Sequence, residues 1–335
     1  MGQTTFNPAR DIPDQSGKVY FVTGGKSPLI SVQGFPSIDN RSTNTAATGT
    51  AGLGAGCIEY LSAHKPAHIF FSGRSKDKAA ALISKIHTTH PDQALTYIEC
   101  DFKSLDSVYA AAKQVRASTT RLDVLMCNAG IMALGPETTR DGYEVQFQVN
   151  HLSHALTINT LLPLLSETAA RHGGDARIVN LSSIAYDQAP RSGIEFATLR
   201  SKQASFGGLL GFPKWQRYGQ SKLANLLYPA QLAKHHPDVT SVAVHPGVIM
   251  TDLFANVSLV SRLPAMIINW NQIIPVEQGP HSQLWASTCD KSKLVNGGYF
   301  EPVGVVGKRK TKHARNERLG DELWSWTQKA LEKYS

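Results

Sequence analysis

Seven apolar runs that alternate with stretches of helical periodicity constrain the fold of this chain more than any other feature. Such a rhythm is typical of a parallel sheet with helices packed on both of its faces. We expect strands at 18–23, 67–72, 94–100, 122–128, 176–181, 239–245 and 297–300. We expect helices at 52–63, 76–89, 104–117, 140–168, 217–235 and 276–289. The rhythm contains no linker or repeat, so we predict a single doubly wound α/β domain over residues 1–335, with a seven-stranded, mostly parallel sheet.

The composition fits a globular protein and argues against several other classes. Hydrophobic residues make up 41% of the chain, which is enough for a large core. There is no run of 18 apolar residues and no signal-peptide pattern, so we expect a cytoplasmic protein without a transmembrane segment. The 4 cysteines and 12 histidines are dispersed, and we therefore name no disulfide and no metal site. The basic segment 308–318 is expected to be a solvated loop, because no nucleic-acid-binding module surrounds it.

A glycine-rich turn follows the first expected strand, but residues 26–49 interrupt it. In a dinucleotide-binding fold this turn lets the N–H groups of the next helix face the pyrophosphate. Joining VTGG (22–25) directly to TAGLGAG (50–56) gives the pattern T-G-x-x-x-G-x-G. The residues that this pattern assigns to the cofactor are Thr23, Gly24, Gly25, Gly52, Leu53 and Gly54.

Further motifs follow in a characteristic order. NAG (128–130) ends the fourth expected strand, and VQFQVNHLSHA (145–155), LSSIA (181–185), YGQSK (218–222) and HPGVIMTDL (245–253) come after it. With the glycine pattern, this order resembles the short-chain dehydrogenase/reductase family over residues 17–305. The 35-residue separation of Ser183 from Tyr218 resembles the retinol-dehydrogenase-like branch of that family. The resemblance implies a Rossmann fold and hydride transfer to or from a nicotinamide cofactor.

The resemblance assigns four catalytic residues. Tyr218 would exchange a proton with the substrate oxygen, Ser183 would hydrogen-bond that oxygen, and Asn150 would hold a water that relays protons to Lys222. Lys222 lies four residues after Tyr218, on the same helical face, and its charge would lower the pKa of the tyrosine. We assign Ser183 in preference to Ser182. A second Tyr-x-x-x-Lys match at 109–113 is rejected because it precedes the NAG motif.

The residues after the second expected strand indicate which cofactor binds. Arg74 stands there and no acid does, which favours the 2′-phosphate of NADP(H) over the ribose hydroxyls of NAD. Asp101, closing the third strand, resembles the family's contact to the adenine, although a helix N-cap would explain it equally well. The resemblance also assigns to the cofactor Asn128, Ala129, Gly130, Tyr218, Lys222, Pro246, Gly247, Val248 and Thr251.

Two regions are expected to cover a small-molecule carbonyl or alcohol substrate. Residues 184–216 are a long irregular stretch, and residues 255–275 are apolar and mildly amphipathic. Together they predict a bulky, lipophilic substrate. Weak peripheral membrane contact and homo-oligomer formation stay open, and no nucleic-acid partner is expected.

Two interpretations of residues 26–49 compete. The first is a surface excursion that leaves the glycine turn and returns to it, which loop-closure entropy tolerates. The second is a translated intron, because codons for Gly25 to Ser27 and for Thr48 and Gly49 can contain splice consensus sequences. Its removal would restore VTGGTAGLGAG in frame.

These residues together predict an NADP-dependent oxidoreductase that uses a Ser-Tyr-Lys mechanism with an asparagine. One alternative is a catalytically silent regulatory protein that binds NADP. Another is a form in which the insertion at 26–49 impairs cofactor binding.

Overall fold

The computed structural model describes residues 6–24, 52–171, 173–206, 212–249 and 273–334. Their main sheet has eight strands in the order β10-β9-β6-β5-β4-β1-β2-β3. Neighbouring strands are parallel except β10, which runs antiparallel to β9. The strands are β1 (Val19–Val22), β2 (His68–Gly73), β3 (Leu95–Glu99), β4 (Val124–Cys127), β5 (Arg177–Leu181), β6 (Thr240–Val244), β9 (Tyr299–Glu301) and β10 (Val305–Val306). A separate two-stranded sheet pairs β7 (Val248–Ile249) with β8 (Ile273–Ile274).

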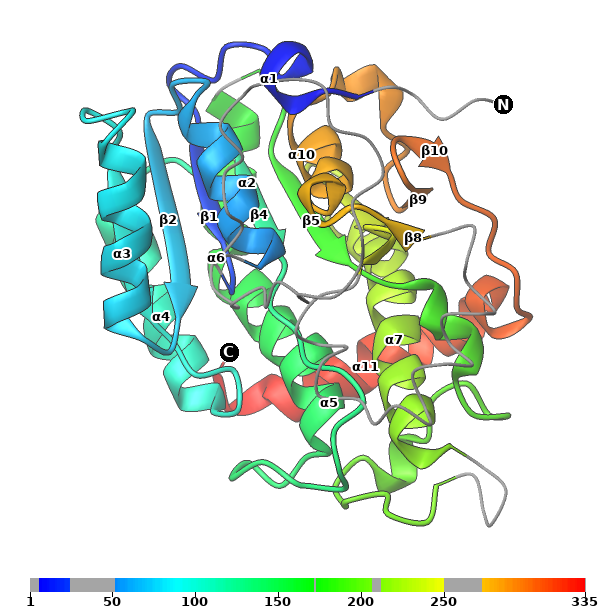
Figure 1. Ribbon diagram of the computed structural model, residues 1–335. Coiled ribbons are helices and arrows are strands. Elements are labelled where there is room, and N and C mark those ends of the chain that lie inside the picture. The colour runs from blue at the N-terminus through cyan, green and yellow to red at the C-terminus, as the bar shows by residue number, and fades with distance from the viewer. Residues whose placement is uncertain (1–5, 25–51, 172, 207–211, 250–272, 335) are drawn as a thin grey trace, which may run out of the picture.

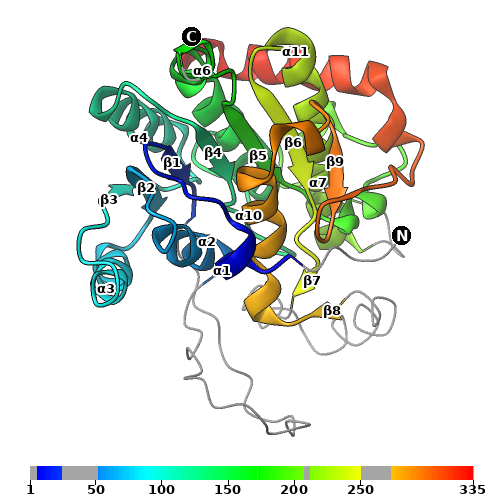
Figure 2. The same ribbon diagram turned by 90° about the horizontal axis from the view of Figure 1, so that it is seen from above.

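Helices cover both faces of the main sheet (Figure 1, Figure 2). Successive side chains of a strand point to opposite faces, and in β1 Val19 and Phe21 join one core cluster while Tyr20 and Val22 join the other. The first cluster is covered by α4 (Leu105–Ser118), α6 (Ser153–Arg171), α7 (Pro213–His235) and α11 (Glu317–Leu331). The second is covered by α1 (Pro8–Asp11), α2 (Leu53–Ser62), α3 (Lys76–His87) and α10 (His281–Thr288).

Short helical turns connect these elements. The chain enters α6 through α5 (Val145–Phe147) and the π-helix η1 (Gln148–Leu152). The 3₁₀ helices are η2 (Ile184–Gln188), η3 (Phe196–Thr198), η5 (Val276–Gln278), η6 (Lys291–Lys293), η7 (His313–Arg315) and η8 (Glu332–Tyr334).

The doubly wound α/β fold is confirmed, with three differences in detail. The seven expected strands correspond to β1 to β6 and β9, and the short edge strand β10 makes the count eight instead of seven. The expected helix 140–168 instead has its regular part in α6, after the π-helix. The basic segment 308–318 is not wholly a loop, because it includes η7 and the start of the unexpected helix α11.

The strand order fixes where a site can form. β1 lies between β2 and β4, so the chain leaves β1 toward one side of the sheet and later returns to its other side. At such a topological switch point a crevice opens outside the carboxyl ends of the strands. The predicted site residues Thr23, Asn128 and Ser183 all follow strands that end at this edge.

Candidate active site

The first glycine turn is joined to the end of β4 through Thr23. Its hydroxyl accepts hydrogen bonds from the backbone N–H groups of Asn128 (2.9 Å) and Ala129 (3.1 Å). The Asn128 side chain donates to the carbonyls of Thr23 (3.0 Å) and Gly24 (3.1 Å). Gly24 has φ +66°, and a Cβ there would lie 2.7 Å from Ala129 Cα. A side chain at Gly24 would therefore separate the two segments.

The second part of the glycine motif begins α2. Gly52 is the N-cap, and within the described residues no side chain caps this helix end. Leu53 and Gly54 form the first turn, whose N–H groups have no carbonyl partner within an α-helix. This leaves donors for an anionic group, as a phosphate-binding turn requires. Gly25 and the interrupting residues 26–49 lie outside the described residues.

Ser183 and Tyr218 meet at the end of β5. A hydrogen bond from the Ser183 side chain lowers the pKa of Tyr218, but burial acts more strongly and raises that pKa to about 12. The neighbouring Ser182 hydroxyl instead donates to the backbone carbonyl of Lys222 at 2.7 Å. The structure thus places Ser183, and not Ser182, against the tyrosine.

Lys222 lies behind the tyrosine ring. Its Nζ is 5.7 Å from the Tyr218 ring centroid and donates to the carbonyl of Leu181 at 2.9 Å. Burial lowers the pKa of Lys222 to about 8. Burial raises the pKa of Tyr218 more than the Ser183 hydrogen bond lowers it, and the expected lowering of this pKa by Lys222 stays a prediction.

Gly219 brings the tyrosine helix close to the serine segment. A Cβ at Gly219 would lie 2.7 Å from Ala189 N and 2.8 Å from the carbonyl oxygen of Ala185. Real Cβ atoms do not approach backbone this closely, so α7 can lie against η2 only with glycine here. This contact sets the separation between Ser183 and Tyr218.

Asn150 lies in the π-helix η1. Such π-turns interrupt regular helices and are frequent at functional sites. Its side-chain oxygen accepts from Ile131 N (2.8 Å), and its amide donates to Ile131 O (2.9 Å) and Ser221 Oγ (2.9 Å). Ser221 in turn donates to the carbonyl of Tyr218 at 2.7 Å. The side chain of Asn150 therefore connects the segment after NAG to α7.

Gly130 shows how closely the motifs converge. A Cβ at Gly130 would lie 3.3 Å from Asn150 Oδ1 and 3.7 Å from Lys222 Nζ. The NAG glycine, the asparagine and the lysine thus meet at one point, although they come from β4, η1 and α7.

His154 is a buried part of the site that the sequence analysis did not identify. Its Nδ1 lies 3.0 Å from the carbonyl of Asn150, and its Nε2 lies 2.9 Å from Thr23 Oγ1. A carbonyl can only accept, so Nδ1 carries the proton and Nε2 accepts from the threonine hydroxyl. Burial lowers the pKa of His154 to about 4, which keeps the ring neutral. His154 follows Asn150 by four residues, and this spacing could have predicted that the two side chains lie on the same face of a helix.

The residues predicted to contact the adenosine half lie at the ends of β2 and β3. Arg74 follows β2 and is exposed. Ser72, on the same strand, is buried, and its hydroxyl has no partner among the described residues. Asp101 is half-buried, and its carboxylate accepts from Lys103 N at 3.1 Å. The alternative role of Asp101 as a helix N-cap is wrong, because Ser104 caps α4 and accepts from Ser107 N.

The predicted Pro-Gly turn follows β6. Pro246 and Val248 flank Gly247, which has φ +101°. This positive φ favours glycine, and a Cβ here would also lie 2.5 Å from the Cδ1 atom of Ile274, which belongs to β8. Thr251 and the predicted lid at 255–275, apart from Ile273, Ile274 and Pro275, lie outside the described residues.

Sequence comparisons agree with this arrangement. The family profile described as short chain dehydrogenase matches residues 45–198. An uncharacterised oxidoreductase of Schizosaccharomyces pombe is 34% identical over an alignment that covers 98% of this chain and 88% of the relative. The chain belongs to the short-chain dehydrogenase/reductase family.

Other relatives place this short-chain dehydrogenase/reductase within the family. Mouse retinol dehydrogenase 12 is 31% identical, with 78% of each chain covered, and this supports the predicted retinol-dehydrogenase-like branch. The crystal structure of an NADPH-bound carbonyl reductase from chicken fatty liver has the same fold. Its TM-score is 0.57 at 21% identity, covering 87% of this chain and 99% of that one.

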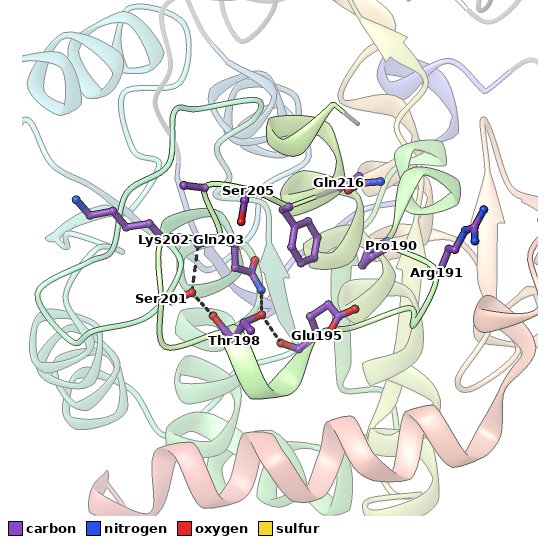
Figure 3. Close-up of a pocket in the computed structure, with 11 residues that line it drawn as sticks. Pro190, Arg191, Glu195, Thr198, Ser201, Lys202, Gln203, Ser205 and Gln216 are labelled. Carbon is purple, nitrogen blue, oxygen red and sulfur yellow. Dashed lines mark hydrogen bonds between the residues drawn. The ribbon is translucent and has the colours of Figure 1, made fainter. Parts of the chain in front are cut away.

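This short-chain dehydrogenase/reductase also has a cavity of about 820 Å³ beside α7 (Figure 3). Most of the residues that line it are polar or charged, and all of them belong to the predicted cover at 184–216. The lining residues are Pro190, Arg191, Glu195, Thr198, Ser201, Lys202, Gln203, Ala204, Ser205, Phe206 and Gln216. The predicted catalytic residues Ser183, Tyr218 and Lys222 are not among them, although Gln216 belongs to the same helix as Tyr218 and Lys222. Among the described residues, no helix is both long and apolar enough to cross a membrane.

Proposed function

We propose that this protein is an NADP(H)-dependent oxidoreductase that transfers hydride between the nicotinamide and a carbonyl or secondary alcohol. The observation that carries this proposal is that Lys222 Nζ lies 5.7 Å from the Tyr218 ring, while the Ser183 side chain lowers the pKa of the same tyrosine. These three groups lie at the carboxyl edge of a doubly wound sheet, beside the glycine turn.

The residues of the crevice fit a dinucleotide. Asn128 Oδ1 and Ser72 Oγ are buried polar atoms without partners among the described residues, and a bound ligand would satisfy them. Gly24 lets the first glycine turn lie directly against Ala129, and the start of α2 offers N–H donors to the pyrophosphate. When bound, the cofactor supplies or accepts the hydride.

The preference for NADP(H) rests on Arg74. An exposed guanidinium directly after β2 suits the 2′-phosphate, whereas an acid there would suit the ribose hydroxyls of NAD. The NADPH in the carbonyl reductase of the same fold supports this preference.

The protein's own groups handle the proton. In the reduction direction, the Tyr218 hydroxyl donates its proton to the substrate oxygen, while Ser183 donates a hydrogen bond to that oxygen as negative charge develops. Burial favours the protonated phenol before the reaction, so Tyr218 is ready to act as an acid. Lys222, held by the carbonyl of Leu181, then stabilises the tyrosinate. Asn150 connects the loop at Ile131 to Ser221, the residue before Lys222, through its side-chain hydrogen bonds. By resemblance to the family, Asn150 would also support a proton relay to Lys222.

We infer a bulky, lipophilic substrate. The name of mouse retinol dehydrogenase 12 supports this inference, as does the apolar composition of residues 255–275.

Following NADPH absorbance tests the proposal directly. The assay should use all-trans-retinal, decanal and 4-nitrobenzaldehyde, with wild-type protein and the Tyr218→Phe variant. We expect wild-type turnover with at least one of the three, faster with NADPH than with NADH. The variant should lose turnover but still bind NADPH, as followed by fluorescence. Equal rates for the two proteins would contradict the assigned role of Tyr218.

The second candidate is that this protein is a form of the enzyme in which residues 26–49 impair cofactor binding. The glycine motif is interrupted at 26–49, and the family profile begins to match only at residue 45. Deletion of residues 26–49 restores the contiguous motif. If the insertion impairs binding, the deletion will lower the Kd for NADPH at least tenfold, and an unchanged Kd would favour a genuine surface excursion. Sequencing the transcript across codon 25 tests the intron independently.

A further inference from the structure

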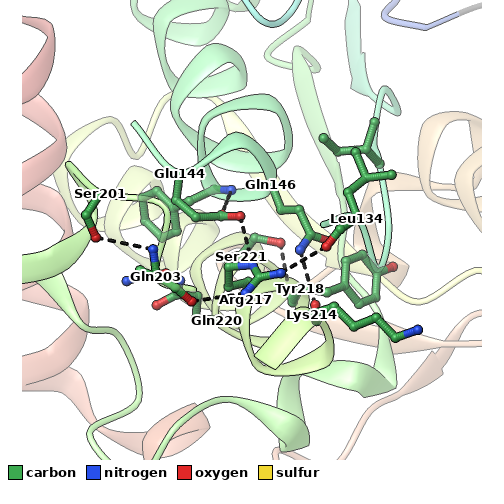
Figure 4. A network of polar contacts seen from close by, with 12 residues as sticks. Leu134, Glu144, Gln146, Ser201, Gln203, Lys214, Arg217, Tyr218, Gln220 and Ser221 are labelled. Carbon is green, nitrogen blue, oxygen red and sulfur yellow. Dashed lines mark hydrogen bonds and ion pairs between the residues drawn. The ribbon is translucent and has the colours of Figure 1, made fainter. Parts of the chain in front are cut away.

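Arg217, the residue before Tyr218, is buried together with an acidic partner. Arg217 is 1% exposed and Glu144 is 0% exposed. Arg217 Nε lies 3.4 Å from Glu144 Oε1. Its two terminal nitrogens donate to the backbone carbonyls of Gln203 (3.0 Å) and Leu134 (2.9 Å). We call Arg217, Glu144 and these two carbonyls the Arg217 clamp (Figure 4).

The Arg217 clamp joins three segments that are far apart in the sequence. Leu134 belongs to the loop that follows the NAG motif, and Gln203 belongs to the cover that lines the cavity. Glu144 ends the segment before α5 and accepts from Phe147 N at 2.7 Å, which caps that helix. All three segments are therefore fixed to the first turns of α7.

Gln203 is buried and makes further hydrogen bonds through its side chain. It is 6% exposed, and its φ of +45° is uncommon for a residue with a side chain. Its side chain donates to Thr198 Oγ1 at 2.8 Å and accepts from Gln220 Nε2 at 2.6 Å. The backbone oxygen that Arg217 binds is thus fixed from two further directions.

Stability alone does not account for a buried ion pair here. Removing two charges from water is costly, and apolar residues of similar volume are often as stable or more stable. Consistent with that cost, burial raises the pKa of Glu144 to about 7. A role in geometry fits better, because the planar guanidinium donates to two backbone carbonyls in a fixed arrangement, while its contact with Glu144 is an ion pair without hydrogen-bond geometry.

Arg217 is well placed to affect the reaction. It directly precedes Tyr218, and in the view of Figure 4 Gln203 and the Tyr218 ring lie on opposite sides of it. Both residues belong to the first two turns of α7, which begins at Pro213. Movement of this end would move the phenol relative to Ser183.

Building on the proposed function, we propose that Arg217 and Glu144 are positioning residues that hold Tyr218 at Ser183 by fixing the start of α7 to the loops at 131–135 and 196–203. They touch neither cofactor nor substrate. Their contribution is to the rate of the chemical step, and not to cofactor affinity.

The experiment separates positioning from folding by means of two matched variants. Arg217→Met removes the Arg217 clamp but leaves Glu144 buried and unpaired. The double variant Glu144→Met/Arg217→Met removes both charges, so its Tm should recover toward the wild-type value. Arg177→Met is the control, because Arg177 is also buried, pairs with Asp175 at 2.6 Å and donates to the carbonyl of Ala286. Arg177 begins β5 and thus lies at the opposite edge of the sheet.

Two measurements are made on each protein, both well below its Tm. The first is kcat and KM for NADPH with the carbonyl that the wild-type protein reduces. The second is hydrogen exchange of peptides covering 131–136, 196–206 and 213–222, which requires no turnover. We expect kcat to fall about ten- to a hundredfold in Arg217→Met and in the double variant, with KM for NADPH within about twofold. Exchange should become faster in all three peptides, while Arg177→Met changes Tm but neither kcat nor these peptides.

The outcomes distinguish the two proposals. If the double variant regains both Tm and kcat, the pair serves folding alone and the positioning role is refuted. Unchanged exchange in Arg217→Met would also refute it. If the wild-type protein reduces none of the three carbonyls, the proposed function fails, and the exchange data still decide whether the Arg217 clamp holds α7.

Discussion

Ser182 donates its hydroxyl hydrogen to the backbone carbonyl of Lys222 at 2.7 Å, whereas the side chain of the next residue, Ser183, acts on Tyr218 and lowers its pKa. Two adjacent serines thus have different tasks, and single substitutions should separate them. Ser183→Ala should lower kcat about a hundredfold or more, because it removes a donor from the developing oxyanion. Ser182→Ala should instead lower the free energy of unfolding by about 1 kcal/mol and reduce kcat less. Steady-state kinetics and urea unfolding of both variants check this, and a larger kcat loss in Ser182→Ala would reverse the assignment.

The buried ammonium of Lys222 should make stability depend on pH. In the folded protein the pKa of Lys222 is lowered to about 8, compared with 10.5 for a free lysine. Between these values the unfolded chain binds more protons, so the contribution of Lys222 to the free energy of unfolding increases as pH rises. The difference between wild type and Lys222→Met should therefore grow by about 2 kcal/mol from about pH 8 to about pH 10. Urea unfolding at both pH values measures it, and parallel pH dependences would show that Lys222 is not desolvated.

Gly219 should tolerate no side chain. A Cβ would lie 2.7 Å from Ala189 N, and α7 would have to move away from η2. We expect Gly219→Ala to cost about 1–3 kcal/mol in unfolding free energy and to lower kcat about ten- to a hundredfold. Gly135→Ala is the control, since a Cβ there meets nothing within 4 Å. Equal behaviour of the two variants would mean that the contact of α7 with η2 does not position Tyr218.

Arg74 should determine the choice of cofactor. Loss of a charge-assisted hydrogen bond to phosphate costs about 1.5–3 kcal/mol. The ratio of kcat/KM for NADPH to that for NADH should accordingly fall about ten- to a hundredfold in Arg74→Ser. Lys85→Ser provides a comparison, because Lys85 lies near the other end of α3, where it pairs with Glu59 at 2.7 Å. A ratio unchanged in Arg74→Ser would assign the 2′-phosphate to other residues.

The regular elements could be predicted because their patterns are local. Strands in a covered parallel sheet are continuous apolar runs, and these identified β1 to β6 and β9. β10 has only Val305 and Val306, too few residues to form a pattern. α11 was not predicted, because the charged segment 308–318 was interpreted as a loop. Leu319, Leu323 and Leu331 have a spacing of four and eight residues, which is typical of a helix.

The residues of the site could be predicted where the order of the motifs along the chain was enough to identify them. Asn150, Ser183, Tyr218 and Lys222 do lie together, as their order along the chain implied. The effect of burial on the pKa of Tyr218 was not predicted, since sequence shows a nearby lysine but not the loss of water around the phenol. The pairing of Glu144 with Arg217 could not be foreseen, because their contact exists only after α5 and α7 have packed.

The π-helix at Gln148–Leu152 makes the site sensitive to the deletion of a single residue. A π-turn holds one residue more than an α-turn, so loss of a single codon here would let the helix become regular. The residues on either side of the deletion would keep their helical faces, and only the widened turn that carries Asn150 would be lost. Asn150 would leave Ile131 and Ser221 without any change in its own identity. Relatives with length variation in this stretch should therefore be rare among active enzymes, even where substitutions are frequent.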